Sequence, residues 1–219
     1  MRELLLTIHL VRHGETVANR KGIIQGQQNS DLTPLGIDQA VATATRLRAN
    51  NYWRVHASDL SRAFRTAEII LEEHEGPIPK KSELLREFRL GVQEGLPRGT
   101  TWSEACRIKA EKDGVPLEDF NAPRRETAAE VRKRAKAFLE ELIADAAQDA
   151  PGRGKEDMVA LVVSHGGLLN VMMVGVMGLG DGVGFMTNCG VTIVEVFKED
   201  GGGTSVSYEA QTVNDDKHL

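Results

Sequence analysis

The feature that most constrains the fold is a set of short apolar runs that alternate with amphipathic segments. Residues 4–11 read LLLTIHLV, residues 54–58 read RVHAS, and residues 158–164 read MVALVVS. Runs of this length, rich in Val, Ile and Leu, are typical of strands buried on both faces of a parallel sheet. Because parallel strands need helical crossovers, the sequence predicts an α/β fold: a three-layer α/β/α sandwich with a mostly parallel central sheet, with an antiparallel edge as an option.

The first two helical segments are indicated by a cap and by the period of their apolar residues. Thr33 followed by Pro34 predicts a helix start, and the inward stripe of that helix is expected to hold Ile37, Ala40, Val41, Ala44 and Leu47. Residues 59–74 predict a second helix, with an inward stripe of Ala63, Ala67, Ile70 and Leu71.

Two capping boxes predict two further helices. Thr101 is followed three residues later by Glu104, and Thr127 by Glu130. The helix after Thr127 has a clear apolar period and is expected to end near residue 149. Its basic run at residues 132–136, RKRAK, is interpreted as the solvent-exposed face of the helix.

The C-terminal part of the chain continues the alternation of strands and helices. A helix is predicted over residues 166–177, followed by a glycine-rich connection and two strands over residues 190–197 and 204–213 that are joined across KEDGGG. Residues 91–126 are rich in Gly, Pro and charge. They predict an excursion over the sheet within a single domain of residues 1–219, not a second domain.

Composition excludes several classes of function. The formal net charge of −5 over 219 residues argues against nucleic-acid binding through the overall field, so an anionic ligand must be attracted by local charge. Cys106 and Cys189 show neither metal-ligand nor disulfide spacing, and no metal site is expected. No apolar run approaches the roughly 18 residues of a membrane span, and no signal peptide is indicated, so we expect a cytoplasmic protein without a membrane partner.

The residues that end the predicted strands carry the chemistry. Arg12 and His13 end the first run, Ser164 and His165 end the late one, and Arg62 falls in the first turn of the helix after RVHAS. In an open parallel sheet the ligand lies beyond the carboxyl ends of the strands. We therefore expect both histidines and both arginines to face one crevice.

Each of these residues also has a structural interpretation. His13 and His165 are each followed by glycine, which permits close approach of a ligand, and this favours the functional interpretation. Arg62 alone could be a surface ion-pair partner, but beside Arg12 it completes a phosphate clamp, since guanidinium groups bind phosphate oxygens bidentately. The remaining histidines are interpreted as structural: His9, His56, His74 and His218.

Six segments in order along the chain resemble the histidine phosphatase superfamily, in its phosphoglycerate-mutase-like branch. They are LVRHGET (10–16), IIQGQ (23–27), DLTPLGIDQA (31–40), SDLSRAFRTA (58–67), LLREFRLGVQEG (84–95) and VVSHGGLL (162–169). The resemblance implies one α/β domain in which residues 91–126 form an insertion that covers the active site. It implies a catalytic set of His13, Glu87, His165, Arg12 and Arg62, and substrate-binding positions at Asn19, Gln25, Gly26 and Gly166.

Within the branch, the chain is most similar to fructose-2,6-bisphosphatase-type phosphatases, through IIQGQ, LLREFRLGVQEG and the tail VNDDKHL. Mutases typically carry RHYG and LQGLNK where this chain has REFRLGVQEGLPRG, and RHGET differs from the acid-phosphatase and phytase pattern. Another departure is PRRET at residues 123–127, where many relatives have PGGES. Arg124 and Arg125 either contact substrate or cover solvent, and the second interpretation is slightly favoured.

The implied mechanism makes His13 the nucleophile and the site of phosphorylation, with Arg12, Arg62 and His165 around the phosphoryl group. Nearby cations disfavour an imidazolium, so we expect a lowered pKa for His13. Glu87 would protonate the leaving oxygen and then deprotonate water. Two alternatives remain for this carboxyl group: an ion pair with Arg86 or Arg89, or replacement by Glu94 in the acid role.

The predicted function is hydrolysis of phosphomonoesters, such as sugar phosphates or bisphosphates including fructose 2,6-bisphosphate, with a small phosphorylated metabolite as substrate and no cofactor. The alternatives are a cofactor-dependent phosphoglycerate mutase and a non-catalytic phosphate-binding or scaffold protein. Selectivity is expected to reside in residues 91–126 and in the loop around residues 23–28. The sequence identifies neither the physiological substrate nor the oligomeric state.

Overall fold

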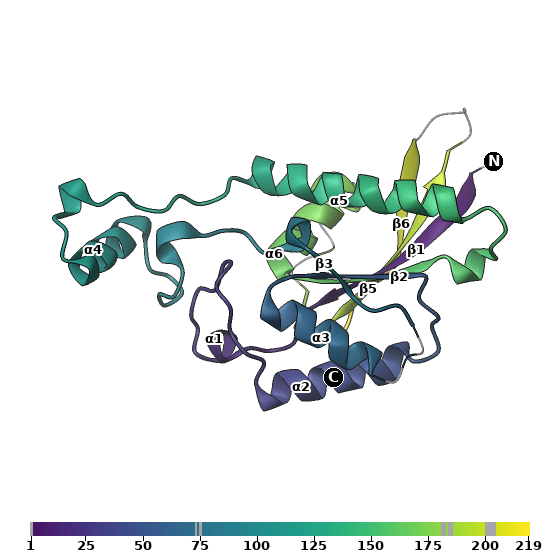
Figure 1. Cartoon of the computed structure of the whole chain (residues 1–219), viewed down its shortest axis with the longest axis horizontal. Helices are drawn as coiled ribbons and strands as arrows, with labels where there is room; N and C mark the ends of the chain where they lie inside the picture. Colours follow the sequence, from purple (N-terminus) through teal and green to yellow (C-terminus); the bar gives the residue numbers. More distant parts are fainter. Residues whose placement is uncertain (1, 73, 75, 181–182, 184–185, 200–204) are drawn as a thin grey trace.

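The centre of the molecule is a six-stranded sheet with strand order β3-β2-β4-β1-β5-β6 (Figure 1). The computed structural model describes residues 2–72, 74, 76–180, 183, 186–199 and 205–219. The strands are β1 (Glu3–Arg12), β2 (Arg54–Ser58), β3 (Lys80–Ser82), β4 (Val159–Ser164), β5 (Val191–Lys198) and β6 (Val206–Asp215). β3, β2, β4 and β1 pair in parallel, whereas β5 is antiparallel to both β1 and β6. The sheet is therefore mostly parallel with an antiparallel edge.

Helices cover both faces of this sheet. In Figure 1, α5 and α6 lie on one side of the sheet and α2 and α3 on the other. The α-helices are α1 (Val17–Arg20), α2 (Pro34–Leu47), α3 (Ser61–Leu71), α4 (Trp102–Asp113), α5 (Ala128–Asp149) and α6 (Gly166–Asn170). Short 3-10 helices occupy Glu83–Leu85, Gly91–Gln93, Leu117–Asp119 and Lys155–Asp157, and a π-helix occupies Val171–Val176. The predicted three-layer sandwich is confirmed.

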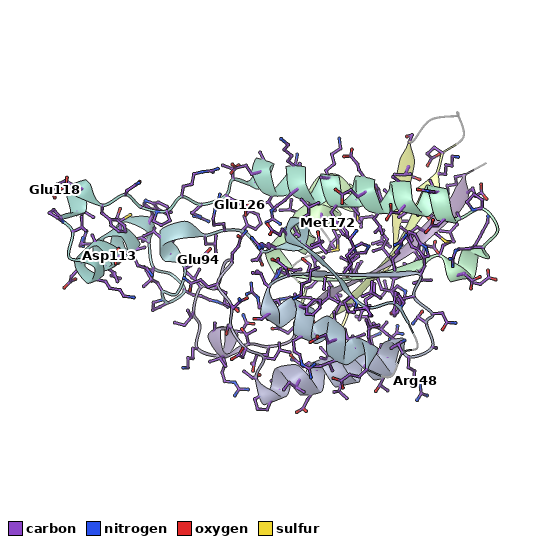
Figure 2. The ribbon with its side chains drawn as sticks, viewed as in Figure 1. Arg48, Glu94, Asp113, Glu118, Glu126 and Met172 are labelled. Carbon is purple, nitrogen blue, oxygen red and sulfur yellow. The ribbon has the colours of Figure 1, made fainter. Side chains whose placement is uncertain are left out.

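The strands sort their side chains between two cores because successive residues point to opposite faces. On β1, the side chains of Leu6, Ile8 and Leu10 pack into the core beneath α5, where Met172 also lies (Figure 2). On β4, alternate residues of the VALVVS run join the opposite core beneath α2 and α3. All six residues of β4 are buried, as expected for a strand covered on both faces.

The orientation of α2 differs from the predicted one. Ile37 and Val41 are 44% and 49% exposed, so their placement on the inward stripe is wrong. The buried side of the helix consists of small residues and one leucine: Gly36, Ala40, Thr43, Ala44 and Leu47. A Cβ atom on Gly36 would stand 2.1 Å from the carbonyl oxygen of Glu15. This close backbone approach turns the glycine side of α2 inward and Ile37 and Val41 outward.

Several predicted elements agree with the structure and some differ. Both capping boxes form at the starts of α4 and α5. The helix expected over residues 166–177 is a short α-helix that continues as a π-helix, and the short edge strand β3 had not been predicted. The KEDGGG connection falls partly outside the described residues.

The segment 91–126 extends from one end of the sheet, beside the loop that follows α1 (Figure 1). It contains α4 and two of the 3-10 helices. Asp113 and Glu118 lie at its far end, and Glu126 lies where the chain returns to α5 (Figure 2). Across the described residues, no helix has the length and apolar character needed to cross a membrane.

Candidate active site

Adjacent strands bring the two predicted histidines together. Arg12 of β1 pairs with Ser164 of β4, and the backbone N–H of His13 donates to the carbonyl oxygen of Ser164 at 3.0 Å. His13 and His165, the next residue on each strand, have ring centroids 5.2 Å apart. Parallel pairing in this register therefore places the two imidazoles side by side at the carboxyl end of the sheet.

Hydrogen bonds define the tautomer of His13. Its Nδ1 lies 2.7 Å from the carbonyl oxygen of Gly14, which can only accept, so Nδ1 carries the proton. The opposite nitrogen, Nε2, accepts from Arg62 Nε at 3.3 Å. The pKa of His13 lies well below its usual value, first because the ring is buried and then because of the guanidinium groups of Arg62 and Arg12. His13 is thus neutral with a lone pair on Nε2.

Two guanidinium groups, a buried one from Arg62 and a half-buried one from Arg12, place positive charge near the His13 ring. Arg62 is 1% exposed, and its two terminal nitrogens donate to the carbonyl oxygens of Gln28 and Gly26 at 2.8 Å each. Burial lowers the pKa of Arg62 to about 10, so the group remains charged at neutral pH. Arg12 donates from Nη1 to the carbonyl oxygen of Met186 at 2.7 Å. Its buried Nε finds no acceptor among the described residues.

His165 is fully buried behind His13. Both of its ring nitrogens lack a hydrogen-bond partner within the described part of the chain. Its pKa is also well below the usual value, because of burial first and then the charge of Arg62. A buried imidazole without partners is unfavourable, so this ring and Arg12 Nε offer polar atoms for a group that enters the site.

These residues surround a cavity of about 590 Å³. Eight sequence-predicted residues line it: Arg12, His13, Asn19, Gln25, Gly26, Arg62, Glu87 and Gly166. Among the described residues, seven others also line it: Ile23, Ile24, Phe88, Leu90, Arg98, Arg125 and Gly167. Of the predicted catalytic set, only His165 stands behind the wall and not in it. Among the described residues, no cluster of His, Cys, Asp or Glu is arranged to hold a metal ion.

Asn19 and Gln25 are oriented by Thr16, the N-cap of α1. The Thr16 hydroxyl lies 3.0 Å from both Asn19 Oδ1 and Gln25 Oε1, and the Thr16 backbone N–H donates to Asn19 Oδ1 at 3.2 Å. Gly26 follows with a φ of +54°, a conformation that favours glycine. The cap therefore positions both amide side chains at the rim of the cavity.

Glu87 is held by the backbone N–H of the next residue and by two backbone N–H groups at the start of α6. Its Oε1 accepts from Phe88 at 2.8 Å and from Leu168 at 3.2 Å, and its Oε2 accepts from Gly167 at 3.0 Å. The ion-pair alternative is wrong for Arg86, whose carboxylate partners are Asp59 and Glu83. For Arg89 no ion pair occurs either, within the described residues. The carboxylate is therefore fixed at the cavity wall by the main chain.

Glu94, the other candidate acid, accepts hydrogen bonds from the backbone of two loops. Its Oε1 accepts from the backbone N–H groups of Leu90 at 2.8 Å and Gln27 at 3.1 Å, and the residue is 8% exposed. A Cβ on Gly26 would collide with this carboxylate at 2.1 Å. Glu94 therefore lies beneath the loop that carries Gly26, outside the cavity wall.

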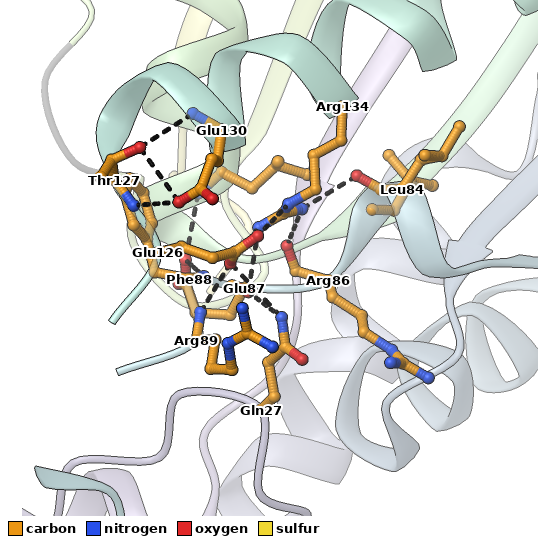
Figure 3. Close-up of polar contacts among 12 residues, drawn as sticks. Gln27, Leu84, Arg86, Glu87, Phe88, Arg89, Glu126, Thr127, Glu130 and Arg134 are labelled. Atoms are coloured by element: carbon orange, nitrogen blue, oxygen red, sulfur yellow. Dashed lines mark hydrogen bonds and ion pairs between the residues drawn. The ribbon is translucent and has the colours of Figure 1, made fainter. Parts of the chain in front are cut away.

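Arg134, whose polar contacts Figure 3 shows, was not predicted from the sequence as a residue of the site. Its guanidinium donates to the carbonyl oxygens of Leu84 at 2.9 Å, of Glu87 at 3.0 Å and of Arg86. Its side chain is 13% exposed and pairs with Glu126 at 3.1 Å, so the interpretation of RKRAK as solvent-exposed is wrong here. Position 134 follows Val131 by three residues and precedes Phe138 by four, which places it beside the buried stripe and could have revealed it.

A neutral buried histidine, flanked by a second histidine and two arginines at the carboxyl ends of parallel strands, is a site suited to phosphate chemistry. The chain belongs to the histidine phosphatase superfamily (branch 1), whose sequence profile matches residues 8–210. Family and enzyme class, a phosphoric monoester hydrolase of the histidine phosphatase type, are confirmed as predicted.

Two curated proteins illustrate the range of relatives. The chain is 36% identical over 177 residues to a probable phosphoglycerate mutase GpmB of Proteus mirabilis (strain HI4320), across 80% of this chain and 76% of that protein. It is 31% identical over 193 residues to the fructose-2,6-bisphosphatase TIGAR B of Danio rerio, across 77% of this chain and 73% of that protein. The relatives thus include both enzyme types that the sequence suggested, a mutase and a bisphosphatase.

Solved structures agree with this placement. A mycobacterial glucosyl-3-phosphoglycerate phosphatase in complex with VO3 superposes with a TM-score of 0.74 at 27% identity, across 95% of this chain and 99% of that one. A phosphoglycerate mutase from Bacillus anthracis str. Sterne shares the fold, with a TM-score of 0.72 at 22% identity across 99% of this chain and 96% of that one.

Proposed function

We propose that this phosphatase hydrolyses phosphomonoesters, in particular sugar phosphates or bisphosphates, through a phosphohistidine on His13. The observation that carries the proposal is the state of His13: a buried neutral ring whose Nε2 lone pair lies 3.3 Å from Arg62 Nε. Relatives named fructose-2,6-bisphosphatase and glucosyl-3-phosphoglycerate phosphatase support this substrate class.

In the first step, His13 Nε2 attacks phosphorus while the bond from phosphorus to the leaving oxygen breaks. Arg12, Arg62 and His165 donate to the phosphoryl oxygens, on which negative charge spreads in the transition state. The buried Nε of Arg12 and the one protonated ring nitrogen of His165, which lack partners in the described structure, gain acceptors in this way. Removing one such donor typically costs about 10²- to 10³-fold in rate.

Glu87 serves both proton transfers. It donates a proton to the departing oxygen, and in the second step it removes one from the water that attacks phosphorus and breaks the bond to His13. Phosphate then leaves and the histidine is restored. The three backbone N–H groups around Glu87 keep its carboxyl group beside the cavity through both steps.

The substrate beyond the phosphoryl group lies against Asn19, Gln25 and Gly26, with Gly166 beside the phosphate. All four positions line the cavity. We further propose that residues 1–219 act as a single domain and that segment 91–126 covers the active site, since Arg98 and Arg125 from that segment reach the cavity wall.

The test is release of inorganic phosphate from a panel of fructose bisphosphates, phosphoglycerates, nucleotides and p-nitrophenyl phosphate, combined with trapping of the intermediate. We expect labelled substrate to leave acid-labile, base-stable phosphate on the protein. The His13→Asn variant should show neither labelling nor turnover. Unchanged turnover in that variant would refute the proposal.

A mutase is the second candidate, because the chain is 36% identical to a protein named probable phosphoglycerate mutase. A mutase returns the phosphoryl group to the substrate, whereas the proposed phosphatase transfers it to water. Conversion of 3- to 2-phosphoglycerate at a rate above that of phosphate release would favour the mutase. Absence of both labelling and turnover would favour the binding or scaffold alternative.

A further inference from the structure

The peptide group that follows His13 is held on both of its sides. The carbonyl oxygen of His13 accepts from the Asn188 side-chain Nδ2 at 2.8 Å, and the N–H of Gly14 donates to the Thr66 hydroxyl at 3.1 Å. This carbonyl and this N–H belong to one peptide unit, which is planar and turns as a rigid body. Asn188 precedes β5 and Thr66 lies in α3, so two segments that are distant in the sequence fix one peptide plane.

This peptide plane influences where the His13 ring points. The N–H of His13 is paired with β4 through Ser164 at 3.0 Å, whereas its ring Nδ1 donates to the carbonyl oxygen of Gly14 at 2.7 Å. Glycine has more backbone freedom than other residues, so contacts from outside are needed to hold it. A change at the peptide between His13 and Gly14 would shift that carbonyl oxygen relative to the ring, and it would move Nε2 with it.

Asn188 is presented by a turn that is itself tied to β1. The N–H of Gly190 donates to the carbonyl oxygen of Thr187 at 3.0 Å and closes the turn. The N–H of Cys189 donates to the carbonyl oxygen of Arg12 at 2.9 Å. Cys189 has a φ of +60°, a left-handed conformation that is costly for a residue other than glycine and persists only where surrounding contacts impose it. The turn therefore holds Asn188 in a defined place beside the nucleophile.

The amide of Asn188 has a partner that nothing else in the described part of the chain satisfies. No other hydrogen bond from those residues reaches the carbonyl oxygen of His13, and a carbonyl oxygen can only accept, so it is the N–H₂ end of the amide that faces it. His13 is 3% exposed, and a buried carbonyl group without a donor is unfavourable.

We propose that Asn188 and Thr66 are positioning residues for the nucleophile: together they fix the peptide between His13 and Gly14 so that His13 Nε2 points at phosphorus. The inference rests on the proposed phosphatase function. Neither side chain is among the described residues that line the cavity. Their removal should therefore impair attack on phosphorus and not the binding of the anion.

Two variants remove the two contacts. Asn188→Ala and Thr66→Val should each lower kcat/KM for p-nitrophenyl phosphate by about 10- to 100-fold, because a displacement of about 1 Å in a reacting group costs this much. Rapid-quench measurements should show the same decrease in the rate at which acid-labile phosphate forms on the protein. Circular dichroism and urea unfolding verify that each variant is folded.

Two inhibitors distinguish a positioning role from general damage to the site. Inorganic phosphate binds as a tetrahedral anion, whereas vanadate accepts a fifth ligand and then resembles the transition state of attack by Nε2. In both variants we expect the inhibition constant of vanadate to rise by about 10- to 100-fold and that of phosphate to change by less than about 3-fold. A purely structural role would change both constants equally.

The chain offers a matched control for each variant. Asn50 Nδ2 donates to the carbonyl oxygen of Leu47 at 2.8 Å, which is the same type of bond at the same length, away from the cavity. The Thr45 hydroxyl donates to the carbonyl oxygen of Val41, four residues earlier, as that of Thr66 does to the carbonyl oxygen of its own helix. Asn50→Ala and Thr45→Val should leave kcat/KM and both inhibition constants unchanged.

The outcomes separate this inference from the proposed function. No phosphate release by the wild-type protein from any substrate would refute the phosphatase itself. Wild-type turnover, with kcat/KM in the folded Asn188→Ala variant reduced by less than about 3-fold, would refute the positioning role alone. Equal increases of both inhibition constants, or failure of both variants to fold, would also overturn it. If one variant fails to fold, the other decides, since both act on the same peptide.

Discussion

At His13, two separate effects keep the lone pair of Nε2 available. Burial is the larger cause of its lowered pKa, and the guanidinium groups of Arg62 and Arg12 add to it. The sequence indicated only the charges, since burial of a residue at a strand end depends on what packs over it. The hydrogen bond from Nδ1 to the carbonyl oxygen of Gly14 then directs the other nitrogen toward Arg62.

The two candidate acids, Glu87 and Glu94, are expected to respond differently to the same substitution. Glu87→Gln should lower kcat by about 10²- to 10⁴-fold, because a glutamine at the cavity wall cannot transfer the proton. The amide also sets an N–H₂ group against a backbone N–H, which costs about 1–3 kcal/mol of stability. Steady-state kinetics and urea unfolding measure the two effects.

Glu94→Gln is the matched control for this prediction. Its carboxylate bonds to the N–H groups of Leu90 and Gln27, so we expect a loss of stability and a decrease in kcat below about 10-fold. If only Glu94→Gln lost turnover, Glu94 and not Glu87 would be the general acid.

At the scale of elements, Arg134 joins α5 to the segment that carries Glu87. One guanidinium bonds to three carbonyl oxygens of that segment and to Glu126, whose Oε2 accepts from the N–H of Arg89 at 2.7 Å (Figure 3). Gln27 donates to the carbonyl oxygen of Glu87 at 3.1 Å from the opposite side. The position of Glu87 is therefore set by α5 and by the loop that follows α1.

Arg134→Met should lower kcat by about 10- to 100-fold with a smaller change in KM, because a displacement of about 1 Å in a catalytic group costs this much. Lysine at this position restores the charge but not the planar set of donors, so it should recover only part of the rate. Lys136→Met is the control, since Lys136 lies on the same helix with its side chain 63% exposed. If Arg134→Met lowered the free energy of unfolding but did not lower kcat relative to Lys136→Met, the role of Arg134 would be structural only.

The sequence predicted elements well where the signal was local and poorly where it depended on contacts between distant segments. Capping boxes and buried strands are local, and both were found. The apolar period of α2 allows two overlapping stripes, and the contact of Gly36 with the Glu15 backbone, which selects one of them, is not visible in the period. Arg134 was missed for the same reason, because its carbonyl partners lie about 50 residues away in the chain.

At the scale of the whole molecule, the strand order explains why the candidate site could be anticipated. β1 and β4 are neighbours and β2 lies beside β4, so the residues that follow these strands must converge. Motif residues at strand ends were therefore predictable. The positions of Arg98 and Arg125 could not be predicted in this way, because segment 91–126 contains no strand whose pairing would fix its position relative to the sheet.

The whole fold is also expected to lose stability in mild acid, because two histidines outside the candidate site are buried. His9 is 5% exposed and bonds to the Tyr52 hydroxyl, and His56 is 7% exposed and packs against Phe138. Burial lowers the pKa of each to about 4. In the unfolded chain both have a pKa of about 6.5, so the unfolded state binds more protons between these values.

The free energy of unfolding should therefore have its full value above about pH 6.5 and decrease as the pH drops toward 4, by up to about 3 kcal/mol per histidine. Urea unfolding between pH 7.5 and 4.5 measures the slope. His56→Leu removes one titrating group and keeps an apolar side chain against Phe138, so the slope should decrease by the equivalent of about one proton. A slope that this variant leaves unchanged would show that His56 binds a proton as readily in the folded protein as in the unfolded chain.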